Sequence, residues 1–106
     1  MPNIKLDSEY DDLDKYNCNN GDIIYFKKET DIVHNPYGAA IIYKNGTKIY
    51  IIENKWHRLD GPALIRSNGV DGYYINDKQL TEEEFELHPE RLKFIGKEHL
   101  ACLGWN

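Results

Sequence analysis

The chain has 106 residues, of which 41% are hydrophobic and 29% are charged, so it is expected to form one small domain with a modest core over residues 1–106. Its net charge is −5, and no apolar run approaches the length of a membrane-spanning helix. This charge argues against general nucleic-acid binding, which needs a surplus of Lys and Arg, and no polybasic patch for a membrane surface is visible.

Residues 1–20 are an acidic segment without the apolar stretch of a secretory signal, so we expect the protein to reside in the cytoplasm. This segment has a net charge of −3, residues 21–78 have +1, and residues 79–106 have −3. A nearly neutral middle therefore lies between two acidic ends. The acidic residues of the first segment are Asp7, Glu9, Asp11, Asp12 and Asp14.

The middle of the chain contains an internal repeat. Residues 33–55 align without a gap on residues 56–78, at an offset of 23 residues. A fixed period of this length is typical of a repeat architecture. Nine aligned pairs are identical, namely His34/His57, Gly38/Gly61, Ala40/Ala63, Ile42/Ile65, Asn45/Asn68, Gly46/Gly69, Tyr50/Tyr73, Ile52/Ile75 and Lys55/Lys78.

Each copy is predicted to form a β-hairpin, because Asn-Gly between two apolar runs favours a two-residue type I′ turn. A turn at Asn45-Gly46 would place Ile42 opposite Ile49, and the same turn in the second copy would place Ile65 opposite Gly72. A partial earlier copy occupies residues 20–26. We therefore expect an antiparallel meander of about five strands within residues 21–78, with the chain reversing between hairpins at residues 34–38 and 57–62.

Both faces of this meander would be apolar, so another segment must cover at least one of them. Residues 79–106 are the candidate, as a helical cap. Thr81 followed by Glu84 is a capping-box pattern, and Pro89 is expected to begin a second short helix. The apolar side chains expected to cover the sheet are Phe85, Leu92, Phe94 and Ile95.

The second copy begins with Trp-His-Arg-Leu-Asp-Gly-Pro-Ala at residues 56–63 and continues with Asn68-Gly69 and residues 73–76. This pattern resembles the HR-x-DGPA repeats of bacteriophage and giant-virus proteins, which are similar to MORN repeats. The resemblance covers residues 33–85 and departs from the pattern in the first copy, at residues 35–37 and 39. It implies a viral origin, a stack of β-hairpins and a role in binding protein or lipid, but no reaction.

The histidines, the cysteines and Asp60 are the residues that could carry catalysis or bind a metal. His34 and His57 could be catalytic or metal-binding, but their recurrence in the repeat favours hydrogen bonds to the turn that follows, and Asp60-Gly61 likewise favours a turn. The two cysteines are expected to be reduced. A zinc site is disfavoured because the candidate ligands lack a CxxC or HxxxH spacing; these ligands are Cys18, Cys102, His88 and His99.

The acidic N-terminus supports a more specific hypothesis. Carboxylates on a small phage protein can stand in for phosphates opposite the Lys and Arg side chains of a nucleic-acid channel. Tyr10 and Tyr16 would add contact area beside the acidic residues. The alternative is a solvated acidic arm that aids solubility.

We therefore expect a mainly β (α+β) domain, an antiparallel meander of MORN-like β-hairpin repeats capped by one or two short C-terminal helices. We expect a non-enzymatic, phage-encoded protein without a cofactor or metal that binds a host protein in the host cytoplasm. Its proposed target is a defence nuclease such as a CRISPR effector. The partner-binding residues would be Asp7, Glu9, Tyr10, Asp11, Asp12, Asp14 and Tyr16. The alternatives are a structural protein that forms a homo-oligomer and, more remotely, an enzyme.

Overall fold

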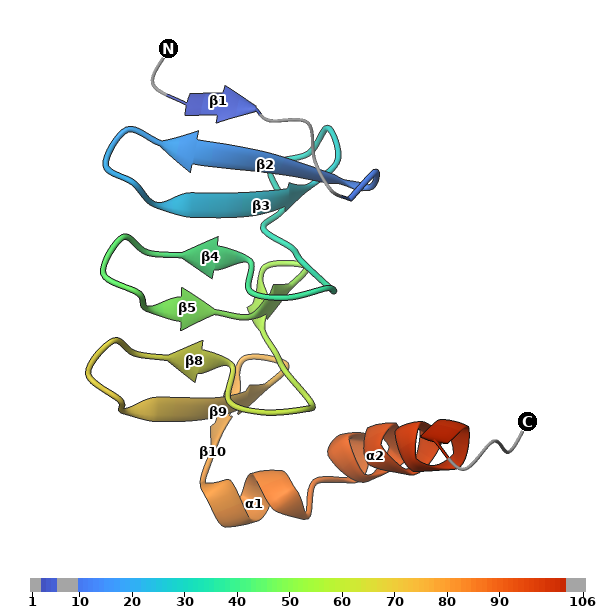
Figure 1. The fold of residues 1–106 in the computed structure, drawn as a ribbon. Coiled ribbons are helices and arrows are strands. Elements are labelled where there is room, and N and C mark those ends of the chain that lie inside the picture. Colours follow the sequence, from blue (N-terminus) through green and yellow to red (C-terminus); the bar gives the residue numbers. More distant parts are fainter. Residues whose placement is uncertain (1–2, 6–9, 103–106) are drawn as a thin grey trace.

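The computed structural model describes the backbone of residues 3–5 and 10–102 and the side chains of residues 10–96. Short strands joined by turns and loops come first in the chain, and two helices follow them (Figure 1). The elements are β1 (Asn3–Lys5), β2 (Leu13–Cys18), β3 (Ile23–Lys27), β4 (Ile41–Ile42), β5 (Lys48–Ile49), β6 (Ile51–Ile52), β7 (Lys55–Trp56), β8 (Leu64–Ile65), β9 (Asp71–Ile75), β10 (Lys78–Leu80), α1 (Glu82–Glu86) and α2 (Pro89–Cys102).

The main sheet has the strand order β1-β2-β3-β4-β5-β8-β9-β10, and each neighbouring pair is antiparallel. Strands β6 and β7 form a separate two-stranded sheet. The predicted antiparallel meander of hairpins followed by short helices is confirmed (Figure 1). The sheet extends further towards the N-terminus than expected, because residues 13–18 of the acidic segment form β2 and pair with β3.

The predicted hairpin register is wrong by one residue. Ile41, not Ile42, lies opposite Ile49, and Leu64, not Ile65, lies opposite Gly72. This register leaves a three-residue loop in both hairpins, at residues 44–46 and 67–69, and in the first the Tyr43 amide donates to the Thr47 carbonyl across the loop. A shift of one residue moves every side chain of a strand to the other face. Ile41 therefore shares a face of the sheet with Ile49, and Leu64 shares one with Gly72.

The backbone of the Asn-Gly pairs explains this shift. A type I′ turn needs positive φ at both residues, but here only the glycines have it, at 98° for Gly21, 96° for Gly46 and 87° for Gly69. Each preceding asparagine accepts a hydrogen bond at its Oδ1 from the amide two residues ahead, as Asn45 does from Thr47 at 2.9 Å. This geometry corresponds to a type I turn that ends in a left-handed glycine.

The two-residue turns with positive φ at both positions occur at the opposite end of each hairpin unit. They are Glu53-Asn54, between β6 and β7, and Asn76-Asp77, between β9 and β10. The chain thus reverses between units in two places rather than one. Between the two copies the tight turn at Glu53-Asn54 comes first, and the predicted segment 57–62 follows it with a second reversal.

Two apolar clusters form the core. The first lies between the main sheet and the β6–β7 sheet, where Ile49 and Leu64 meet Ile51, with Trp56 and Tyr74 packed against them. The Trp56 and Tyr74 rings meet edge to face at 4.9 Å. The second cluster brings α1 onto the last hairpin and consists of Ile75, Leu80 and Phe85, flanked by Leu59 and Tyr73.

Helix α1 begins with the predicted capping box. Thr81 Oγ1 accepts a hydrogen bond from the Glu84 amide at 3.1 Å, and Glu84 Oε1 accepts one from the Thr81 amide at 2.9 Å. The helix buries Phe85, which is 1% exposed. The prediction that Phe85 covers the sheet is therefore confirmed.

Helix α2 begins at Pro89, as predicted, but it projects from the body of the protein (Figure 1). The expectation that Leu92 and Ile95 cover the sheet is wrong, because their exposed fractions are 50% and 37%. Helix α2 is instead attached through Arg91, which donates to the Leu59 carbonyl at 2.8 Å and pairs with Glu86 at 3.1 Å.

Within the part of the chain that the structure describes, no helix is long and apolar enough to span a bilayer.

Candidate functional site

The structure separates the residues that the sequence grouped as partner-binding. Asp7 and Glu9 lie outside the described residues. Asp11 and Asp12 are exposed, just before β2. Asp14 is only 3% exposed, and its Oδ2 accepts a hydrogen bond from the Glu29 amide at 2.8 Å. Asp14 thus fixes the loop after β3 and is not accessible to a partner, which corrects its predicted role at a contact surface.

The two predicted tyrosines lie on opposite faces of the first hairpin. Tyr16 meets Phe26 edge to face at 5.5 Å and lines a hollow of about 270 Å³ together with Cys18 and Ile24. Tyr10 instead contacts Tyr25, whose position in β3 is opposite Lys15 and therefore on the other face. A flat partner surface cannot contact both tyrosines at once.

Tyr37 joins Tyr10 and Asp12 in a group that we call the N-terminal tyrosine cluster. The Tyr10 and Tyr37 rings are stacked, with centroids 4.5 Å apart and an interplanar angle of 17°. The Tyr37 hydroxyl donates to the Asp12 carboxylate, at 3.0 Å from Oδ2. This hydrogen bond raises the pKa of Tyr37 above its usual 10.0. Tyr37 remains 56% exposed.

The sequence-based prediction missed Tyr37. Its signal was present in the alignment of the copies, where Tyr37 takes the position of Asp60 and departs from the HR-x-DGPA pattern. A large exposed aromatic residue in place of a turn residue is a change that hairpin geometry does not require. The departure therefore indicates a role other than the turn itself.

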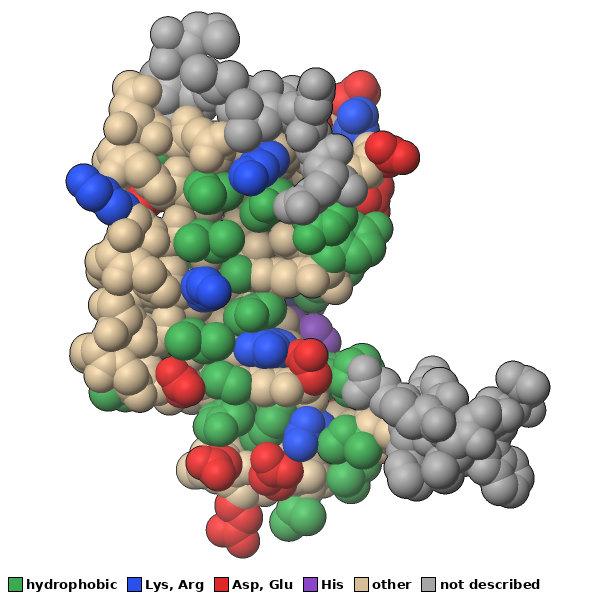
Figure 2. All heavy atoms as spheres, in the orientation of Figure 1, with side chains coloured by type: hydrophobic (Ala, Val, Ile, Leu, Met, Phe, Trp, Pro, Cys, Tyr) green, Lys and Arg blue, Asp and Glu red, His purple; other side chains and the backbone are tan. Residues whose placement is uncertain are grey.

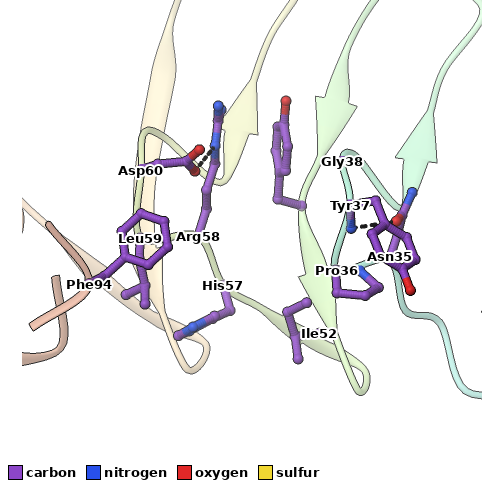
Figure 3. Close-up of a pocket in the computed structure, with 11 residues that line it drawn as sticks. Asn35, Pro36, Tyr37, Gly38, Ile52, His57, Arg58, Leu59, Asp60 and Phe94 are labelled. Carbon is purple, nitrogen blue, oxygen red and sulfur yellow. Dashed lines mark hydrogen bonds and ion pairs between the residues drawn. The ribbon is translucent and has the colours of Figure 1, made fainter. Parts of the chain in front are cut away.

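A shallow groove of about 210 Å³ separates the equivalent loops of the two copies (Figure 3). One side is formed by residues 35–38, the other by residues 57–60, and Phe94 of α2 lies next to Leu59 at one end of the groove. The position of Phe94 shows that α2 reaches the second loop. Tyr50 and Ile52 complete the lining.

Arg58 organises the second loop. Its Nε donates to Asp60 at 2.8 Å, one terminal nitrogen donates to the Pro62 carbonyl at 3.1 Å, and its guanidinium lies 4.0 Å from the centre of the Tyr50 ring (Figure 3). Gly61 permits this arrangement, since a Cβ there would lie 3.0 Å from Arg58 Cζ. Arg58 therefore braces the loop.

Asn35 performs the corresponding task in the first copy. Its Nδ2 donates to the Ala39 carbonyl at 2.9 Å, as Arg58 does to Pro62 at the aligned position. Its Oδ1 accepts from the Tyr37 amide at 2.8 Å. Bracing of the loop is thus common to both copies, although the residue that performs it differs.

His34 and His57 each accept a hydrogen bond from a turn, as expected, but it is not the turn that directly follows each of them in the sequence. The turn is the tight turn that follows the next hairpin along the chain: His34 Nδ1 accepts from the Glu53 amide at 2.9 Å, and His57 Nδ1 accepts from the Asn76 amide at 3.1 Å. Burial lowers the pKa of both imidazoles below 6.5. Among the residues with described side chains, no group of three His, Cys, Asp or Glu could hold a metal ion; Cys102 and His99 lie outside that set.

Charge is unevenly distributed over the visible face of the molecule (Figure 2). Apolar side chains run down the sheet, Lys and Arg side chains lie beside them, and acidic side chains gather near β2 and over α1. Asp11 and Asp12 are exposed just before β2, and Asp12 belongs to the N-terminal tyrosine cluster. No family model, curated protein or solved structure matches this chain.

Proposed function

We propose that this protein is a non-enzymatic, phage-encoded binding protein that inhibits a host defence nuclease, such as a CRISPR effector, by occupying a basic surface of that host protein. The N-terminal tyrosine cluster is the observation that carries the proposal. It presents the exposed Tyr37 ring beside Asp11 and Asp12 on the outside of the first hairpin. The viral origin comes from the resemblance of the hairpin copies to phage repeats.

The cluster has the composition of a protein contact. Tyrosine supplies a large, rigid contact area with a polar end, and carboxylates beside it can pair with Lys or Arg. Stacking on Tyr10 and the hydrogen bond to Asp12 hold the Tyr37 ring in place before a partner arrives. Less side-chain entropy is therefore lost on binding.

The test is an affinity pull-down from bacterial lysate at low and moderate salt, followed by titration of the recovered protein with three variants. Tyr37→Ala removes the exposed ring, and Asp11→Asn with Asp12→Asn removes the two charges. We expect each of these two variants to bind at least tenfold more weakly than the parent protein. The charge variant should also reduce the salt dependence of binding. The matched control is Glu82→Gln with Glu83→Gln, which removes two exposed charges from α1.

If the two test variants bind the recovered protein as tightly as the parent protein and the control variant do, the proposed contact surface is contradicted. Full activity of the recovered nuclease at saturating concentrations of this protein would contradict inhibition. These two results are independent, so the surface and the inhibitory role are tested separately.

A second candidate function is assembly into a homo-oligomer. It is supported by three exposed apolar residues on and just before α2, with exposed fractions of 67% for Leu87, 50% for Leu92 and 37% for Ile95. A projecting helix with such a face can pack against the same helix of a second copy. Light scattering should then show a dimer that Leu92→Lys with Ile95→Lys converts to a monomer, whereas a monomeric parent protein would reject this function.

A further inference from the structure

The two histidines of the repeat make the same hydrogen bond, one unit apart. In each case the imidazole Nδ1 accepts from the amide of the first residue of a tight turn, Glu53 for His34 and Asn76 for His57. That turn follows the next hairpin along the chain, β4–β5 for His34 and β8–β9 for His57, and lies 19 residues beyond the histidine within the same 23-residue copy. If a hairpin and the tight turn after it are taken as one hairpin unit, each histidine joins the end of one unit to the tight turn of the next and does not act within its own loop.

Two more hydrogen bonds accompany each histidine at this junction. The Val33 amide donates to Asn54 Oδ1 at 2.8 Å, and the Asn54 amide donates to the Val33 carbonyl at 2.9 Å. The Trp56 amide likewise donates to Asp77 Oδ1 at 2.7 Å, and the Asp77 amide donates to the Trp56 carbonyl at 2.9 Å. The imidazole thus supplies one of three hydrogen bonds that attach each tight turn.

Only one ionisation state of the imidazole is compatible with this geometry. Nδ1 can accept a hydrogen bond when the ring is neutral and its proton is on Nε2, whereas the imidazolium carries a proton on both nitrogens. Protonation would bring an N–H of the ring against the N–H of the turn. The hydrogen bond would then be replaced by repulsion between two donors.

The third equivalent position provides an internal comparison. Leu80 follows His57 at the same offset of 23 residues, but within the described part of the chain it is followed by α1 and not by another hairpin. Its side chain is 9% exposed and packs with Ile75 and Phe85. Histidine therefore stands where a tight turn must be held, and an apolar residue replaces it where α1 follows.

We infer that His34 and His57 are acid-sensitive links between successive hairpin units, and that protonation of either ring releases the tight turn of the next unit. The inference concerns the repeat body and is independent of the proposed function. Lys27 of β3, Glu53 of the tight turn and Asp12 act on His34, while Glu90 of α2 and His88 act on His57.

These neighbours oppose one another, and burial decides the direction. Glu53, Asp12 and Glu90 favour the imidazolium, whereas Lys27 and His88 disfavour it. Burial is the largest influence on both rings and lowers both pKa values below the unfolded value of 6.5. The stability due to the links is therefore complete above about pH 6.5 and is lost as the pH falls from there through the folded pKa values.

The test is a pH titration of the full-length protein from pH 7.5 to 4.5 by nuclear magnetic resonance. Nitrogen-15 spectra of the imidazoles should show the Nε2–H tautomer for both rings at pH 7.5. Amide exchange, corrected for its intrinsic pH dependence, should show protection of the Glu53 and Asn76 amides at pH 7.5. Below the pKa of each ring that protection should decrease by up to about tenfold per pH unit, in step with protonation.

Substitution by asparagine separates acidity from structure, because its Oδ1 can replace Nδ1 as an acceptor without titrating. His34→Asn with His57→Asn should keep both amides protected throughout the titration, and His88→Asn should retain the pH-dependent loss. Protection that is unchanged in the parent protein while both rings become protonated would overturn the inference. An Nδ1–H tautomer at pH 7.5 would overturn it as well.

Discussion

Asp14 has a structural role that its neighbours in the sequence do not share. Its carboxylate is buried and accepts a hydrogen bond from the Glu29 amide, in a loop where Glu29 itself has a positive φ of 60°. A run of acidic residues predicts a solvated or partner-facing segment, because the sequence does not show which of them the strand turns inward. Asp14 is buried beside the loop after β3, whose Glu29 amide it binds, and this loop is 15 residues away in the sequence.

Asp14→Ala should therefore destabilise the protein by about 1–3 kcal/mol, since the acceptor for the Glu29 amide is lost from a buried position. Asp14→Asn retains an acceptor and should recover part of this loss. The measurement is the midpoint and slope of urea unfolding. Asp11→Asn, at an exposed position, is the control and should change the free energy of unfolding by less than about 0.5 kcal/mol.

The loop glycines give a second prediction at this scale. Gly46 and Gly69 have φ values of 96° and 87°, which cost a residue with a Cβ roughly 1–2 kcal/mol. Gly46→Ala and Gly69→Ala should each lower the free energy of unfolding by about that amount. Gly38→Ala is the matched control, because Gly38 has no such φ and a Cβ there would have no atom within 4 Å. Equal losses at all three positions would contradict the explanation.

The same loops show why the register could not be deduced from sequence. Asn-Gly favours both the two-residue type I′ turn and the three-residue loop with a left-handed glycine, so the dipeptide does not choose between them. The choice depends on whether Asn45 and Asn68 adopt positive φ. In the structure their side chains instead bind the amides of Thr47 and Val70.

For the two helices, the sequence predicted where each one begins but did not predict how α2 is oriented. The capping box at Thr81 and the start of α2 at Pro89 depend on a few adjacent residues, and the sequence contains them all. The direction of α2 depends on Arg91, whose partners Leu59 and Glu86 lie in a different loop and a different helix. The apolar residues of α2 therefore predicted burial where the structure leaves Leu92 and Ile95 exposed.

Arg91 should accordingly control the attachment of α2. Besides its two polar contacts, its guanidinium lies 4.6 Å from the centre of the Phe85 ring. Arg91→Ala should increase amide exchange throughout α2 and lower the free energy of unfolding by about 1–3 kcal/mol. Arg91→Lys should restore little, because a lysine cannot contact both partners with a planar group. Lys93→Ala, at an exposed position of the same helix, should leave exchange unchanged.

At the scale of the whole molecule, the repeat predicted the architecture because its period is a property of the sequence itself. The candidate site was not predicted in the same way. Tyr37 lies 27 residues after Tyr10 and reaches it only because β3 and the following loop return to the start of β2. The structure brought together Tyr10, Asp12 and Tyr37, and it separated them from Asp14 and Tyr16.

A stack built from equivalent junctions should accept another unit. A second copy of residues 56–78 inserted between Lys78 and Gln79 recreates the junction that Lys55 makes with Trp56. We expect a folded protein about 10 Å longer, since two strands are added, with a steeper dependence of unfolding on denaturant. Small-angle scattering and urea unfolding provide the measurements. A flexible 23-residue linker at the same position is the control and should leave the slope nearly unchanged.

Paired strands lie close together along the sequence, and this has a consequence for folding during synthesis on the ribosome. The most distant partners in the described register, Ile23 and Ile42, are 19 positions apart. A hairpin can therefore close as soon as its own residues have left the exit tunnel, while α1 and α2 are still being translated. Protease resistance of stalled nascent chains should then appear in steps, one for each completed unit. A single step at full length would show that the hairpins wait for the C-terminal helices.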